Sequence, residues 1–177
     1  SDDGATYTFN INPRVDAWHD RTPFDVDDII FGLNRWVDPP AGIIQPRVGN
    51  LGFIDSMRKV NETTLDITLS QPFGDFIAEL ANGWHVILPQ HILEANDNTL
   101  PSADLTIGTG PYKFVEWVQG ERIVFEPNPD YWGEKPKWSK ATFRPINSDP
   151  SRLAALLSGA VDIIDFVPTT DLASLRA

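Results

Sequence analysis

Three segments built around glycine and proline divide residues 107–164 and limit the folds that this chain can adopt. Their sequences are Gly-Thr-Gly-Pro at 108–111, Asn-Pro-Asp-Tyr-Trp-Gly at 128–133 and Ser-Gly-Ala-Val-Asp at 158–162. Because glycine frees the backbone and proline restricts it, each segment marks a turn or a helix end. The stretches between them are therefore expected to be short strands and helices.

The same segments predict the elements of the second half of the chain. Asp149 can cap a helix with Pro150 at its first position, and Gly159 stands where a left-handed residue would end that helix. A further helix is expected to be capped by Thr169 or Thr170. Alternation and β-branched content predict strands over 112–117, 122–126, 142–145 and 161–167.

Hydrophobic spacing organises the first half. Apolar residues recur from Val26 to Val37 at the spacing of one helix face, and Asp25 can cap that helix. Residues 41–52 instead combine Gly, Pro and isolated aliphatics, which indicates an irregular loop of the kind that often carries binding contacts. The other expected elements are strands over 6–11, 56–60 and 64–69 and helices over 73–80 and 89–95. Turn residues between the strands predict two β-hairpins, one over 56–69 and one over 112–126.

Strands and helices are mixed along the whole chain, so the expected fold class is α/β or mixed α+β. A chain of 177 residues can bury a substantial core, in one or two compact lobes. With 41% hydrophobic and 22% charged residues, it has the composition of a soluble globular protein, and its apolar runs are too short for a membrane span.

Charge and cysteine content exclude several classes of function. The formal net charge is -11 and the 14 Lys and Arg residues are scattered, so nucleic-acid binding is disfavoured. Without cysteine there is no disulfide, thiolate zinc site, cysteine nucleophile or lipid-bearing N-terminal cysteine in these residues. Residues 1–4 lead directly into the first strand, so any export signal is expected to have been removed or to lie outside this sequence.

Metal and nucleotide motifs are not found in the sequence. His19, His85 and His91 form no i, i+4 pair, so we expect loop or surface histidines, with no metal and no cofactor. The Gly108-Thr109-Gly110 turn lacks the third glycine of a dinucleotide fingerprint. We expect both of its glycines to take backbone angles closed to other residues.

Catalytic patterns are equally absent from the sequence, so no catalytic residue is assigned. There is no Gly-x-Ser-x-Gly elbow. Acidic residues at 25–28 and 162–165 are explained by helix capping and solvated strand positions.

Aromatic residues are the best candidates for ligand contacts, because they give large contact areas at little entropic cost. The chain has six tryptophans and ten phenylalanines. Trp84 and His85, between Gly83 and Val86, are the expected ligand-binding residues, and a purely structural role is the alternative for Trp84. Most of the other aromatics, including Trp36 on its helix and Trp117 at a strand end, are expected in the core.

Longer segments carry a family resemblance in their order. They are Trp-His-Asp-Arg-Thr-Pro-Phe at 18–24, Asp-Ile-Ile-Phe-Gly-Leu-Asn-Arg at 28–35, Val-Asn-Glu-Thr-Thr-Leu at 60–65 and Ser-Gln-Pro-Phe at 70–73, followed by the segments of 107–164. Together they resemble the extracellular solute-binding proteins of family 5, the peptide- and nickel-binding type that serves ABC transporters. The resemblance covers nearly all of the chain. Arg21 departs from it, standing where the family usually has glycine, and 12–17 replaces the usual approach to that turn.

The resemblance implies a partial first lobe of a periplasmic binding protein-like class II fold. Residues 1–106 would form the smaller subdomain of lobe I, 107–165 part of its main sheet subdomain, and 166–177 the start of the crossing toward a second lobe. The implied protein is periplasmic or extracellular and not an enzyme. It would capture a peptide or another small solute for an ABC transporter permease, and would meet the membrane only through that transporter.

Two alternatives come from other classes. One is a small hydrolase without a recognisable local motif, which would need a base of perturbed pKa beside a nucleophile in a cleft. The other is a structural interaction module, which a large exposed apolar face without a cavity would favour. The resemblance leaves the ligand open among dipeptides, oligopeptides, nickel complexes, sugars and opines, with most contacts expected outside these residues.

Overall fold

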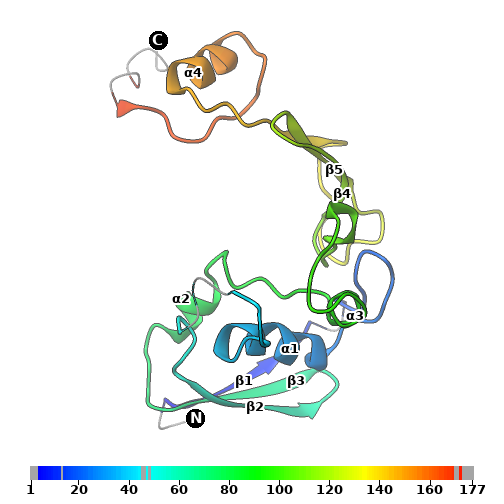
Figure 1. Ribbon diagram of the computed structural model, residues 1–177, viewed down its shortest axis with the longest axis vertical. Helices are drawn as coiled ribbons and strands as arrows, with labels where there is room; N and C mark the ends of the chain where they lie inside the picture. Colours follow the sequence, from blue (N-terminus) through cyan, green and yellow to red (C-terminus); the bar gives the residue numbers. More distant parts are fainter. Residues whose placement is uncertain (1–3, 13, 45–46, 48, 170–171, 173–177) are drawn as a thin grey trace.

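The computed structural model describes residues 4–12, 14–44, 47, 49–169 and 172, and it contains two three-stranded sheets (Figure 1). The elements are β1 (Thr6–Asn10), α1 (Val26–Val37), β2 (Ile54–Asn61), β3 (Thr64–Leu69), α2 (Phe76–Leu80), α3 (Gln90–Ala95), a 3₁₀ turn η1 (Ala103–Leu105), β4 (Tyr112–Val118), β5 (Arg122–Pro127), β6 (Ala141–Phe143) and α4 (Asp149–Leu157). The expected mixture of strands and helices is confirmed. Thr170 lies outside the described residues.

The first sheet is antiparallel in the order β1-β3-β2, as the expected 56–69 hairpin requires. Its register places Phe9 opposite Leu65 and Met57 opposite Ile67. Along the central strand, burial alternates so that Leu65, Ile67 and Leu69 point into the core. One face of the sheet is therefore apolar and needs a covering layer.

Helix α1 provides that layer and covers one face of the sheet (Figure 1). The expected cap is confirmed as a complete capping box, because the Asp25 side chain accepts from the start of the helix while Asp28 accepts from the Asp25 backbone. Of the predicted apolar face, Val26, Leu33 and Trp36 are buried. Periodicity and capping together thus fixed both the position and the orientation of this helix.

Phe76 at the start of α2 lies at the centre of the first core and is fully buried. Its ring meets Tyr7, Phe53 and Phe9 edge-on at centroid distances of 4.8, 5.8 and 6.1 Å. The side chain joins α2 to strand β1 and to Phe53, the residue before β2.

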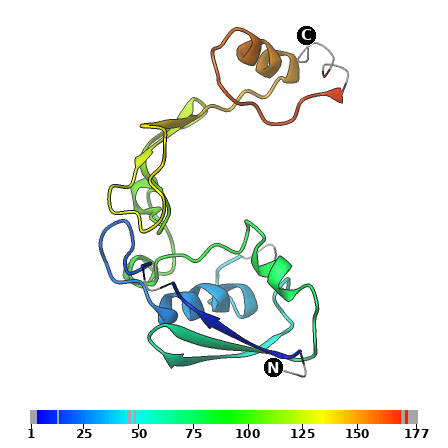
Figure 2. The ribbon, with the colours of Figure 1, turned by 180° about the vertical axis from the view of Figure 1, so that it is seen from behind.

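The second sheet is antiparallel in the order β4-β5-β6. Its rings stack edge-on from Phe114 to Phe125 and on to Phe143. Only Val124 in these strands is buried, and Trp117 and Phe143 are more than half exposed. The expectation that Trp117 lies in the core is therefore wrong, because no described layer covers its face of this small sheet. Figures 1 and 2 show this sheet between the first sheet and α4, so that the chain outlines an open arc.

Helix α4 begins one residue earlier than expected. Its N-cap is Ser148, whose hydroxyl accepts from the Ser151 amide, so Asp149 is the first helical residue and not the cap. Either side chain can cap, and the structure uses the serine. Gly159 does take the expected left-handed conformation, with φ of 72°.

The strand predicted over 161–167 does not form. Ile163 and Phe166 are 75% and 80% exposed, and no strand of the described residues pairs with this segment. A short apolar run becomes a strand only when another strand satisfies its backbone groups. Here the guanidinium of Arg152 donates to the carbonyl oxygens of Asp165 and Phe166 at 3.2 and 3.4 Å.

Candidate functional site

Trp84 and His85 lie in the turn that follows α2, but their side chains occupy different environments. The Asn82 side chain accepts from the Trp84 amide, and the Asn82 carbonyl accepts from the His85 amide at 3.0 Å. The Trp84 side chain is 58% exposed, whereas His85 is buried. Trp84 is therefore open to a ligand, and His85 supports the turn from beneath.

Arg47 stacks on Trp84, with its guanidinium carbon 4.3 Å from the ring centroid. This residue belongs to the 41–52 stretch that the sequence marked as an irregular loop with binding contacts. Nothing in the local sequence singled out Arg47, because its partner lies 37 positions away. The pair presents an aromatic face and a positive charge side by side.

His85 lies in a loop, as expected, but its ring is buried and not at the surface. Its ring packs edge-on against Trp36 at 4.8 Å, and its Nδ1 lies 2.9 Å from the Glu79 carbonyl oxygen. A carbonyl accepts only, so Nδ1 carries a proton. Nε2 has no hydrogen-bond partner among the described residues, and the Glu79 carboxylate stands 3.8 Å away.

His19 joins the first part of the chain to the 108–110 turn. Its Nδ1 accepts from the Gly108 amide at 3.2 Å, and its Nε2 lies 2.9 Å from the Gly110 carbonyl oxygen. Both contacts require a neutral ring with the proton on Nε2. Burial lowers the pKa of His19, although the bond to Gly110 raises it in part.

The glycines of that turn differ from expectation. Neither Gly108 nor Gly110 has a φ in the left-handed region. The turn is held instead by His19 and by Asn128, whose side chain donates to the Gly110 carbonyl at 3.3 Å. Long-range side-chain bonds, rather than glycine conformations, thus shape this segment.

The acidic residues near α1 serve the structure, as expected. The Asp28 carboxylate accepts from the Trp18 indole at 3.1 Å and from the Asp25 amide at 3.3 Å. Burial raises the pKa of Asp28, against the lowering effect of these bonds. His91 bonds to the Asp20 carboxylate at 2.8 Å. Within the described residues, no group of three His, Cys, Asp or Glu side chains could hold a metal ion.

No helix in the described part of the chain is long and apolar enough to cross a membrane.

The structure thus offers three features for a functional site. They are an exposed Arg47–Trp84 pair, a buried His85 and a hydrogen-bonded junction at His19.

Comparison with known proteins places this chain in a family. The model for bacterial extracellular solute-binding proteins, family 5 Middle, matches residues 1–177. The probable D,D-dipeptide-binding periplasmic protein DdpA of Escherichia coli K12 is 32% identical over 99% of this chain and 34% of its own length. The nickel-binding periplasmic protein of the same organism is 30% identical over 93% of this chain and 31% of its own length.

Solved structures of binding proteins show the same likeness to this chain. AgaA from A. tumefaciens R10, in complex with agropinic acid, has a TM-score of 0.87 and 32% identity over 98% of this chain and 34% of its own. DppA from Helicobacter pylori, in complex with the peptide STSA, has a TM-score of 0.86 and 27% identity over 99% of this chain and 38% of its own.

The chain thus spans about a third of the length of the curated relatives that it matches. Its fold is part of the periplasmic binding protein class II fold, so the expected fold class is confirmed. By sequence match over its whole length and by structural likeness, the chain belongs to the bacterial extracellular solute-binding proteins of family 5.

Proposed function

We propose that this chain is part of the substrate-binding component of an ABC importer, which captures peptides or related small solutes in the periplasm and hands them to a membrane permease. The observation that carries this proposal is the family match over all 177 residues. Relatives bind ligands as different as the peptide STSA, agropinic acid and Ni(L-His). Such a component binds without chemical conversion.

The chain divides, in this proposal, as the sequence suggested. Residues 1–106 form the smaller subdomain of lobe I, 107–165 part of its main sheet subdomain, and 166–177 begin the crossing toward a second lobe. Two observations support the division. Each of the first two parts contains its own three-stranded sheet, and the aromatic core around Phe76 draws all its members from the first.

Trp84 contacts the solute directly in this proposal. Its exposed ring offers a large surface with few rotatable bonds, and Arg47 adds a guanidinium that can meet a ligand carboxylate. His85 acts from below, because its buried ring fixes the turn against Trp36 and Glu79.

The test uses the natural protein that contains this sequence. Mass spectrometry of the solute that co-purifies with it identifies the ligand, and calorimetry then gives the affinity. Trp84→Ala is expected to weaken binding by about tenfold or more, as truncation of a central aromatic contact does. Trp138→Ala is the matched control, since Trp138 is equally exposed, at 66%, but lies beyond the β4–β5 hairpin. Equal affinity for wild type and Trp84→Ala would refute the role of Trp84, and the absence of any bound solute would refute the function.

The 177-residue chain alone is expected to bind this solute weakly or not at all. It spans about a third of its relatives, and a ligand held between two lobes needs contacts from both. Calorimetry with the identified solute checks this, and tight binding by the chain alone would show that the second lobe is dispensable.

A further inference from the structure

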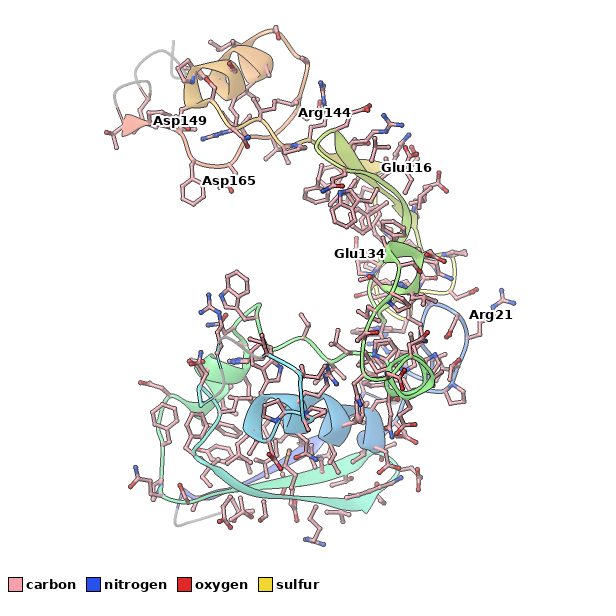
Figure 3. All side chains as sticks on the ribbon, viewed as in Figure 1. Arg21, Glu116, Glu134, Arg144, Asp149 and Asp165 are labelled. Carbon is pink, nitrogen blue, oxygen red and sulfur yellow. The ribbon has the colours of Figure 1, made fainter. Side chains whose placement is uncertain are left out.

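A pocket lies away from Trp84, where the loop over 14–21 meets the turns at 109–113 and 128–132. Its volume is about 220 Å³. Figures 1 and 2 show the loop over 14–21 beside the part of the chain that contains the two turns, and Figure 3 shows Arg21 at the outer edge of the loop. The pocket is smaller than the roughly 300–1,000 Å³ of sites for drug-sized ligands, so its occupant must be small.

Hydrogen bonds hold two of the side chains that line this pocket. Asn128 is buried, and its side chain donates to the Gly110 carbonyl and accepts from the Asp130 amide at 3.3 and 3.0 Å. Trp132 donates its indole N–H to the Thr109 carbonyl at 3.2 Å. Side chains held in this way do not need to be ordered when a ligand arrives.

Arg21 reaches the pocket from a strained position. Its φ of 71° lies in the left-handed region that favours glycine, at a cost of about 1–2 kcal/mol. Its guanidinium pairs with the Asp130 carboxylate across the junction at 3.4 Å. Both side chains are more than half exposed, so this pair alone contributes little stability and does not account for an arginine here.

Three further charges line the pocket. The guanidinium of Arg14 stands 5.8 Å over the Trp132 ring, and the Lys113 ammonium donates to the His19 carbonyl at 2.8 Å. That is its one hydrogen bond to the part of the chain that the structure describes, so two of its three N–H donors can serve a ligand. The carboxylate of Asp16 completes the set. Within the described residues, none of the three forms an ion pair. Besides the Arg21–Asp130 pair, two cations and one anion thus line a small pocket in a chain of net charge -11.

We propose that this pocket binds a small zwitterion of the size of a free amino acid. Arg14 and Lys113 hold its carboxylate, Asp16 holds its ammonium group, and Trp132 lines its aliphatic part. The two aspartates disfavour a dianion such as phosphate, and the two unpaired cations disfavour a simple amine. The site is independent of the solute proposed to bind at Trp84.

The test titrates the ¹⁵N-labelled 177-residue chain with L-alanine while the Trp132 indole N–H is followed by NMR. A saturable shift is expected. N-acetyl-L-alanine lacks the ammonium group and L-alanine methyl ester lacks the carboxylate, so each is expected to bind about tenfold more weakly, the worth of one charge-assisted contact. Arg14→Gln should weaken the binding of L-alanine by a similar factor. Arg144→Gln, an exposed control outside the pocket, should leave that binding unchanged.

Each possible result of this titration supports or overturns the proposed zwitterion site. No saturable shift with any of the three compounds overturns the proposal, as does a shift that Arg14→Gln leaves unchanged. Equal binding of L-alanine and its N-acetyl derivative overturns the zwitterion in favour of a plain carboxylate. Asp16→Asn separates a zwitterion site from a plain carboxylate site, because for a zwitterion site it should weaken the binding of L-alanine and leave the binding of N-acetyl-L-alanine unchanged.

Discussion

The Nε2 atom of His19 lies 2.9 Å from the carbonyl oxygen of Gly110, while Nδ1 of the same ring accepts the Gly108 amide. One neutral imidazole thereby ties the loop before α1 to the turn before β4. Protonation places a second N–H on Nδ1, opposite the amide that now donates to it. The junction between the two sheets therefore depends on the charge of His19.

Acid should weaken this junction. The folded pKa of His19 is lowered from the ordinary 6.5, so the unfolded chain binds its proton first as pH falls. The contribution of His19 to stability is thus complete above 6.5 and is lost as pH falls through the lower folded value. Urea unfolding from pH 7.5 to 5 should show wild type losing more stability than His19→Gln. Parallel curves for the two proteins would contradict the prediction.

The Trp18–Asp28 bond provides a second test, this time of α1. Asp28→Ala removes half of the capping box and leaves the buried Trp18 indole unpaired, at a combined cost of about 2–3 kcal/mol. Asp28→Asn keeps an acceptor and should cost less. Asp27→Ala, which removes an exposed partner of Lys59 in the same turn, should stay within about 0.5 kcal/mol. Urea denaturation gives all three values.

Local signals in the sequence were enough to predict most elements. Around α1, the Asp25 cap, the acidic first turn and the apolar spacing all pointed to one helix, and the structure has it over Val26–Val37. The hairpins also formed where alternation and turn residues placed them. These features depend on neighbours close in sequence, which a single sequence displays.

Contacts between residues far apart in the chain could not be predicted from the sequence. Burial of His85 depends on Trp36, 49 positions away, and the Arg47–Trp84 pair joins two loops with no shared pattern. The apolar run at 161–167 looked like a strand but found no strand partner within the described residues. Periodicity records which face of an element is apolar, and not what will cover it.

Phe76 should be the most costly residue to truncate in the first core. It is fully buried and meets three aromatic rings, so Phe76→Ala should lower the free energy of unfolding by about 3–5 kcal/mol. Ile77→Ala is the matched control, because Ile77 follows it on α2 and is 52% exposed. Urea denaturation followed by circular dichroism compares them, and similar losses for the two variants would contradict this account of the core.

Arg152 should control the order of the segment after α4. Its guanidinium donates to the carbonyls of Ile146, Asp165 and Phe166, and Figure 3 shows Asp165 on the segment that runs past this helix. Arg152→Ala leaves those carbonyls without a donor, so chymotrypsin should cleave after the exposed Phe166 several times faster. Arg152→Lys should give an intermediate rate, because one ammonium cannot match the planar fork of a guanidinium. Arg144→Ala controls for loss of charge. Equal cleavage of wild type and Arg152→Ala would mean that the segment is held by other contacts.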